Sequence, residues 1–171
     1  MIESRRRFLK AGVAGSLALA FAGALRADPG YRAAAADTPL EVLGAGDREV
    51  LAAIVPAMLA GTGGPQQVGA VVASVDRALA GLPPHLQREV GQLFALLGFA
   101  PARWLLAGIR RPWQEASVEE VAAFLERWRT SRFALQQQAY LALHDLVVAS
   151  WYARPDAWPA IGYPGPPRLA A

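Results

Sequence analysis

Apolar residues recur along most of this chain with the spacing of an α-helix, and this periodicity restricts the folds open to it. Between residues 47 and 60, one helical face carries Leu51, Ile54, Val55, Met58 and Leu59. The same spacing predicts further helices over residues 67–80, 84–98, 101–108, 118–129 and 132–152. No segment alternates between apolar and polar residues between hairpin turns, as a β-strand would. We therefore predict an all-α fold, a compact bundle of about five to six helices.

Local sequence signals add detail to the prediction of two of these helices. Ser117 and Glu120 have the spacing of a capping box, in which the two side chains bind backbone N–H groups at the start of a helix. Pro56 lies inside the first predicted helix and lacks an N–H, so we expect a kink or an early end there.

The last predicted helix differs from the others in its composition. Residues 132–152 are apolar on nearly every side after Gln138, which predicts the central helix of the bundle. Three tryptophans outside this helix are expected in or at the edge of the core: Trp104, Trp113 and Trp128.

The N-terminus combines a basic motif with an uncharged run. The motif S-R-R-x-F-L-K is carried by Ser4, Arg5, Arg6, Phe8, Leu9 and Lys10. Residues 11–25 then form an uncharged run that is short for a spanning helix, which needs about 20 apolar residues. The motif resembles the twin-arginine export signal of bacteria, which directs folded proteins to the twin-arginine translocase. Small residues at 34–36 or at 22–24 suit a signal peptidase, and an uncleaved, loosely anchored form is the alternative.

Charge and cysteine content exclude several kinds of site. The whole chain has a net charge of +3, but from residue 37 onward 11 Arg face 12 Asp plus Glu, a net charge of −1. We therefore expect no nucleic-acid partner. The absence of cysteine excludes disulfides, thiolate zinc sites, iron–sulfur clusters and C-x-x-C-H haem attachment. With only His85 and His144 present, far apart in sequence, we expect no metal site and no cofactor of its own.

Candidate catalytic groups are few. His144 and Asp145, with Tyr140 one turn earlier, could form an acid–base group, but a hydrogen-bonded core histidine is the favoured interpretation. His85 follows Pro84 at a helix start and is expected to be exposed. Three carboxylates are interpreted as a helix cap and a solvated face: Glu119, Glu120 and Glu126. We predict a chain that is not an enzyme.

Residues 153–171 form a segment rich in proline, glycine and aromatic residues that cannot be regular helix. Its aromatic side chains predict that it lies against something, either its own bundle or the groove of a partner. Arg127, Arg129 and Arg132 cluster near a helix junction, where they either contact acidic groups of a partner or cover helix ends. The expected partner-binding residues of this segment are Trp158, Ile161, Gly162, Tyr163, Pro164 and Gly165.

With its leader, its helical body and its closing W-x-x-I-G-Y-P-G element, the chain resembles the gluconate 2-dehydrogenase subunit 3 family. The resemblance implies a small periplasmic subunit that escorts a folded, FAD-containing flavoprotein of the glucose-methanol-choline type through twin-arginine export and then stabilises it. It leaves open a cytochrome c subunit and membrane association through the complex. The predicted organisation is a signal peptide and linker (1–36), a helical domain (37–152) and an irregular tail (153–171). Two alternatives are a stand-alone helical protein that binds a small apolar ligand and a small cofactor-free enzyme.

Overall fold

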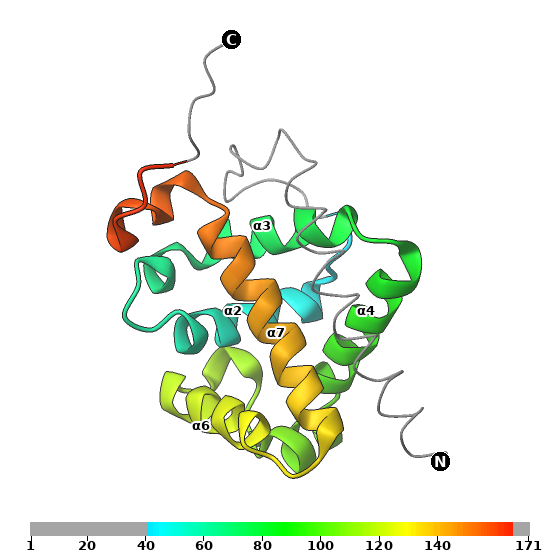
Figure 1. Ribbon diagram of the computed structural model, residues 1–171. Coiled ribbons are helices and arrows are strands. Elements are labelled where there is room, and N and C mark those ends of the chain that lie inside the picture. The colour runs from blue at the N-terminus through cyan, green and yellow to red at the C-terminus, as the bar shows by residue number, and fades with distance from the viewer. Residues whose placement is uncertain (1–40, 166–171) are drawn as a thin grey trace, which may run out of the picture.

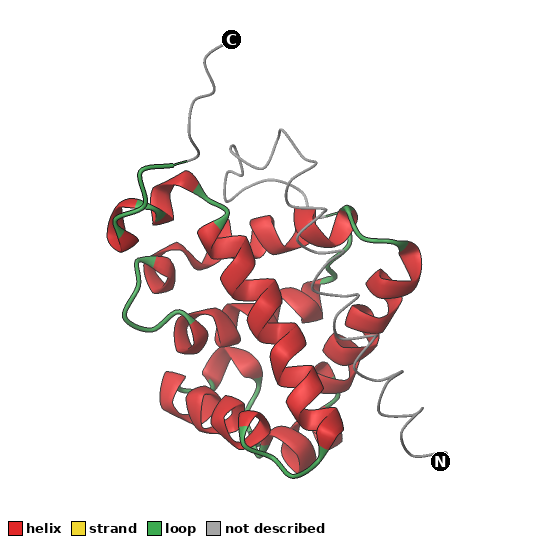
Figure 2. Cartoon of the chain, viewed as in Figure 1, coloured by secondary structure: helices red, strands yellow, loops and turns green. Residues whose placement is uncertain are grey.

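A computed structural model describes residues 41–165. The motif from Ser4 to Lys10 and the predicted leader, residues 1–36, lie outside the described residues. Within residues 41–165 the chain forms helices and turns and no strand (Figure 2), which confirms the all-α prediction.

Five α-helices of three turns or more build the molecule: α2 (Ala45–Met58), α3 (Val68–Ala80), α4 (Pro84–Gly98), α6 (Val118–Arg129) and α7 (Ala134–Tyr152). Short helical turns link them: η2 (Gly64–Gln67), α5 (Ala100–Ala102), η3 (Arg103–Ala107), η4 (Trp113–Glu115), η5 (Pro155–Ala157) and η6 (Pro159–Ile161). The capping box is present, because the Glu120 amide donates to Ser117 Oγ (3.2 Å) and the Ser117 amide donates to Glu120 Oε2 (3.0 Å). The five long helices agree with the predicted segments to within about two residues, the usual uncertainty of helix ends.

The central helix is α2, and the prediction that residues 132–152 hold this place was wrong. Helix α2 contacts α3, α4, α6 and α7, and its Val50, Leu51, Ile54 and Val55 are completely buried. Helix α7 crosses in front of α2 in Figure 1, packing mainly on α3 and α6. The apolar side chains of α7 extend around more of the helix than α3 and α6 cover, so some of these side chains lie at the surface.

The first described residues are fastened to α3. The buried carboxylate of Asp76 accepts hydrogen bonds from the amides of Glu41 (2.6 Å), Val42 (3.0 Å) and Leu43 (2.8 Å). Three backbone donors satisfy a carboxylate that would otherwise be costly to bury. This contact fixes where the chain enters α2.

Helix α4 breaks sharply at its C-terminal end. The segments Pro84–Gly98 and Ala100–Ala107 meet at a bend of 77°. Of the helices in residues 41–165, none alone has both the length and the apolar composition to cross a membrane, and only this bent pair satisfies both criteria together.

Side chains from η4 and α6 hold the break. Trp113 Nε1 donates to the Leu97 carbonyl (2.9 Å), and Trp128 Nε1 donates to the Leu106 carbonyl (3.0 Å). Phe124 lies between these two indoles, edge-on to both, at ring-centroid distances of 6.0 and 4.8 Å. The buried position of Trp113 and Trp128 confirms the prediction for two of the three tryptophans.

Candidate functional site: an apolar groove and an exposed end

A groove with a volume of about 710 Å³ runs between α4 and α7, two helices that share few direct contacts. Val90, Leu93 and Leu96 of α4 line one wall. Leu135 and Leu146 of α7 lie on the other, about 17 Å apart along the helix at 1.5 Å per residue. The hollow is therefore elongated and parallel to a helix.

The lining of the groove is apolar, with a few polar groups. Buried Trp128 and Leu143 form part of its inner surface. Polar lining comes from Glu89, Gln92, Gln136, Gln138 and Asp145. Such a mostly apolar hollow with few polar groups is the composition typical of a binding site.

Apolar exposure continues beyond the groove. Leu135 is 76% exposed and Leu141 is 48% exposed, although both contribute to the lining. An unpaired apolar face of this kind marks an interaction surface when it is contiguous.

The end of the molecule beside the broken helix is also apolar. Trp104 is 53% exposed and Leu105 is 75% exposed, so the prediction that Trp104 lies in or at the edge of the core was wrong. Within this short turn the small side chain of Ala107 faces the core, which directs the larger side chains outward. Phe99 and Phe133 are also more than half exposed.

The three predicted partner-binding arginines all have contacts within the chain. Arg127 Nη2 donates to the Ala107 carbonyl, and Arg132 lies over the ring of Phe133 at 4.9 Å. Arg129 forms an ion pair with Glu126 (2.7 Å), and this hydrogen bond lowers the pKa of the Glu126 carboxyl. These contacts fit the interpretation that the cluster covers a helix end, and binding of a partner by the same arginines stays a prediction.

The predicted tail folds onto the end of α7 as far as residue 165. Trp158 Nε1 donates to the Tyr152 carbonyl (2.9 Å), and Tyr163 meets the Trp158 ring edge-on at 5.3 Å. Gly162 and Gly165 have φ values of +68° and +96°, which glycine adopts without strain. Residues 166–171 lie outside the described residues.

The same tail nevertheless offers apolar side chains to the outside. Ile161 and Tyr163 are exposed, and Pro164 is exposed beside them. The described part therefore packs on its own bundle through one side and presents another side to solvent.

Arg154 fastens the tail from the side of α7. Its guanidinium binds both oxygens of Asp156 and donates to Gln67 Oε1 (2.8 Å). Burial tends to raise the pKa of Asp156. The hydrogen bonds and the charge of Arg154, together with weaker hydrogen bonds from the Asp156 backbone and Gln67, outweigh this effect and leave the pKa below its ordinary value.

His144 is not a core histidine, contrary to the favoured interpretation. Its side chain is 41% exposed on α7, and its Nδ1 lies 3.2 Å from Asp145 Oδ1. Tyr140 stacks beside it at 5.8 Å between ring centroids. His85 is exposed, as predicted. The part of the chain described, residues 41–165, contains no group of three or more His, Cys, Asp or Glu side chains placed to hold a metal ion.

The groove was missed in the sequence, although one signal pointed to it. A helix that is apolar on nearly every side, as residues 132–152 are after Gln138, can lie at the centre of a bundle or carry an apolar surface for a partner. Only the packing of α4 and α7 distinguishes these two cases.

Comparison with known proteins gives no relative: no protein family, no curated protein and no solved structure matches this chain.

Proposed function

We propose that this chain is a non-catalytic helical subunit that binds a folded partner protein through the groove between α4 and α7. The observation that carries the proposal is the combination of an elongated apolar hollow with strongly exposed leucines along its α7 edge. A groove between two helices accepts the apolar face of a third helix, the helix-in-groove mode of recognition. Burying such side chains removes apolar surface from water and stabilises both chains.

The identity of the partner comes from the resemblance. A twin-arginine-like motif and the W-x-x-I-G-Y-P-G element support an exported small subunit of a periplasmic, FAD-dependent dehydrogenase of the glucose-methanol-choline type. In this proposal the small subunit carries the assembled flavoprotein to the twin-arginine translocase. The exposed side of the tail, with Ile161 and Tyr163, adds a second contact to the same partner.

A small apolar ligand is the second candidate occupant, because the volume of the groove falls in the range of about 300–1,000 Å³ common for ligand sites. Such a ligand would fill the hollow but leave much of Leu135 and Leu141 in water. A protein partner would cover them. This difference favours the protein.

Co-expression with the flavoprotein of a neighbouring gene tests the proposal. Purification through this chain should yield a yellow, equimolar complex. Leu135→Gln combined with Leu141→Gln should release the flavoprotein while the free subunit keeps its melting temperature, because both side chains are exposed. Val118→Gln is the matched control, since Val118 is exposed but does not line the groove.

Two results would contradict the proposal. One is a stable complex that survives the double Leu→Gln substitution. The other is a colourless subunit that purifies alone with a lipid-like occupant visible by native mass spectrometry, which would favour the ligand. Replacing Arg5 and Arg6 by Lys should in addition retain both proteins in the cytoplasm, and a flavoprotein that is still exported would exclude the escort role.

A further inference from the structure

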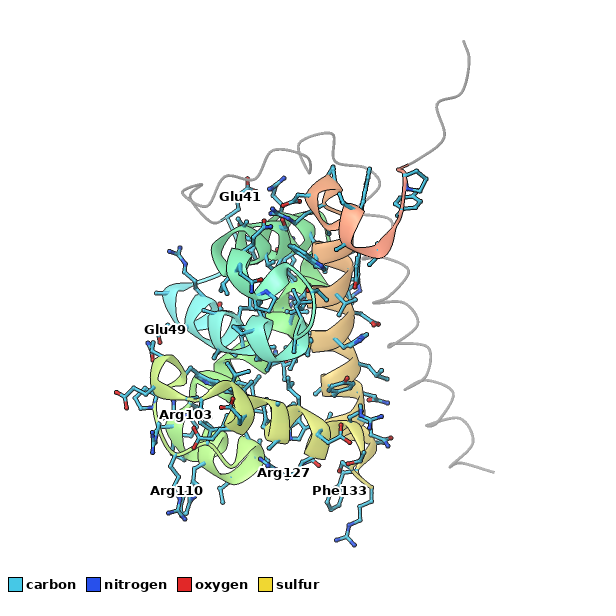
Figure 3. The ribbon with its side chains drawn as sticks, turned by 90° about the vertical axis from the view of Figure 1, so that its left-hand side faces the viewer. Glu41, Glu49, Arg103, Arg110, Arg127 and Phe133 are labelled. Carbon is cyan, nitrogen blue, oxygen red and sulfur yellow. The ribbon has the colours of Figure 1, made fainter. Side chains whose placement is uncertain are left out.

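A second surface lies at the end of the molecule formed by the broken helix and the turn between α6 and α7. We call it the end patch, and its apolar members are Phe99, Trp104, Leu105 and Phe133. Figure 3 shows Arg110 and Phe133 projecting from this end, opposite Glu41. The two segments are neighbours, because Leu106 and Phe133 line the same hollow.

Arginines surround these apolar side chains. The Arg110 guanidinium lies 5.5 Å from the centre of the Trp104 ring, and Arg132 covers Phe133. Arg111 is exposed next to Arg110. Between Glu89 and Glu115 the chain carries three arginines and no carboxylate, and Glu126 near the turn is paired with Arg129. Although residues 37–171 are close to neutral overall, this end has a local excess of positive charge.

The backbone beneath the end patch is well anchored. The Leu106 carbonyl accepts the indole N–H of Trp128, and the Ala107 carbonyl accepts Arg127. Gly108 ends the turn with φ +69°, and a Cβ there would lie 2.8 Å from Arg127 Nη2. The exposure of Trp104 and Leu105 is therefore built into the fold and is not the result of a loose loop.

We propose that the end patch docks on the surface of an anionic phospholipid bilayer. Trp, Phe and Leu side chains enter the boundary between headgroups and acyl chains, while arginines with apolar stems contact lipid phosphates. An apolar centre bordered by arginine, in a stretch of chain without a carboxylate between residues 90 and 114, fits this surface. This inference is separate from the flavoprotein proposal, since Phe99, Trp104 and Leu105 do not line the groove, and only Phe133 belongs to both surfaces.

Tryptophan fluorescence of the full chain tests the docking, because the leader contributes no tryptophan signal of its own. Residues 1–40 contain no tryptophan, Trp113, Trp128 and Trp151 are buried, and Trp158 is half-buried in the tail, so Trp104 is the most exposed of the five tryptophans and the main reporter at the surface. With vesicles of phosphatidylcholine and phosphatidylglycerol in equal parts, brominated acyl chains should quench this fluorescence. Trp104→Phe should remove most of the quenching because it removes the reporter.

Two further variants keep the reporter and alter the surface. Leu105→Glu should abolish the quenching, because it places a carboxylate in the apolar centre. Arg110→Gln with Arg111→Gln should lower the ratio of docked to undocked protein about fivefold per arginine and weaken its dependence on salt. Ile161→Glu is the matched control at the other end of the chain and should leave the quenching unchanged.

The proposal is overturned if brominated lipid leaves the fluorescence of vesicle-bound wild-type chain unchanged, or if quenching persists in Trp104→Phe. It is also overturned if quenching is absent and Leu105→Glu instead releases the flavoprotein, which would make the end patch part of the protein interface. The groove variant with Leu135→Gln and Leu141→Gln should lose the flavoprotein but keep the quenching, so the two proposals fail separately.

Discussion

The carboxylate of Asp76 accepts a hydrogen bond from the amide of Leu43 at 2.8 Å, joining residues 33 positions apart in the sequence. The same oxygen accepts the Val42 amide, and the second oxygen accepts the Glu41 amide. One buried side chain of α3 thus determines how the chain enters the central helix α2.

Replacing Asp76 by Ala should destabilise the fold by about 2–4 kcal/mol, because it leaves backbone donors without their acceptor in a buried place. Denaturant unfolding measures the loss, and hydrogen exchange at residues 41–43 should accelerate. Asp76→Asn retains one acceptor oxygen and should lose less. Equal losses in both variants would contradict this account.

Replacing Trp128 by Phe should cost about 1–3 kcal/mol, since the Leu106 carbonyl loses its donor and part of the ring contact with Phe124 is lost. Trp104→Phe is the matched control and should change the free energy of unfolding by less than about 0.5 kcal/mol, because Trp104 is exposed. A comparable loss in both variants would show that Trp104 is buried in solution.

Gly64→Ala should lower the free energy of unfolding by about 1–3 kcal/mol. A Cβ at this buried position would lie 2.8 Å from the Cβ of Leu59, which is itself buried and has little room to move. Gly91→Ala in α4 meets nothing within 4 Å and should stabilise the protein by about 0.5–1 kcal/mol. Thermal melts should therefore show a lower melting temperature for Gly64→Ala and a higher one for Gly91→Ala than for the wild-type chain.

The attachment of the tail should weaken in acid. The pKa of Asp156 is lower in the folded chain than its ordinary value of 3.8, so its contribution is complete above that value and is lost as the pH falls through the folded pKa. The protection of residues 153–165 from hydrogen exchange, relative to the intrinsic exchange rate at each pH, should therefore decrease below about pH 4. In Asp156→Asn the tail should already be less protected at neutral pH, and its protection should change little in acid; a normal loss of protection in acid in this variant would assign the effect to another group.

Local signals in the sequence predict the helices well. The Ser117–Glu120 pair and the apolar spacing of α2, α3 and α4 act over a few residues, so they do not depend on the rest of the fold. The tail was correctly expected to lack an α-helix, because its prolines cannot donate backbone hydrogen bonds.

Burial was harder to predict, because it depends on which helices meet. Helix α7 is apolar on nearly every side after Gln138, but α4 has few contacts with it, so Leu135 and Leu141 are exposed and a groove forms. Trp104 was expected in or at the edge of the core from its residue type alone, whereas the packing of Ala107 turns it outward. A nearly neutral net charge likewise concealed the arginines at the end patch, since a sum over the chain says nothing about their positions.

The indoles of Trp113 and Trp128 bind carbonyls on the two sides of the 77° bend, with Phe124 wedged between them. To straighten α4 and the following turn into one continuous helix, both indole hydrogen bonds would have to break and the ring contacts of Phe124 would be lost. The bend is consequently a rigid part of the fold and not a hinge. A conformational change on binding a partner is therefore expected in other parts of the molecule, for example as an increase in the separation of α4 and α7.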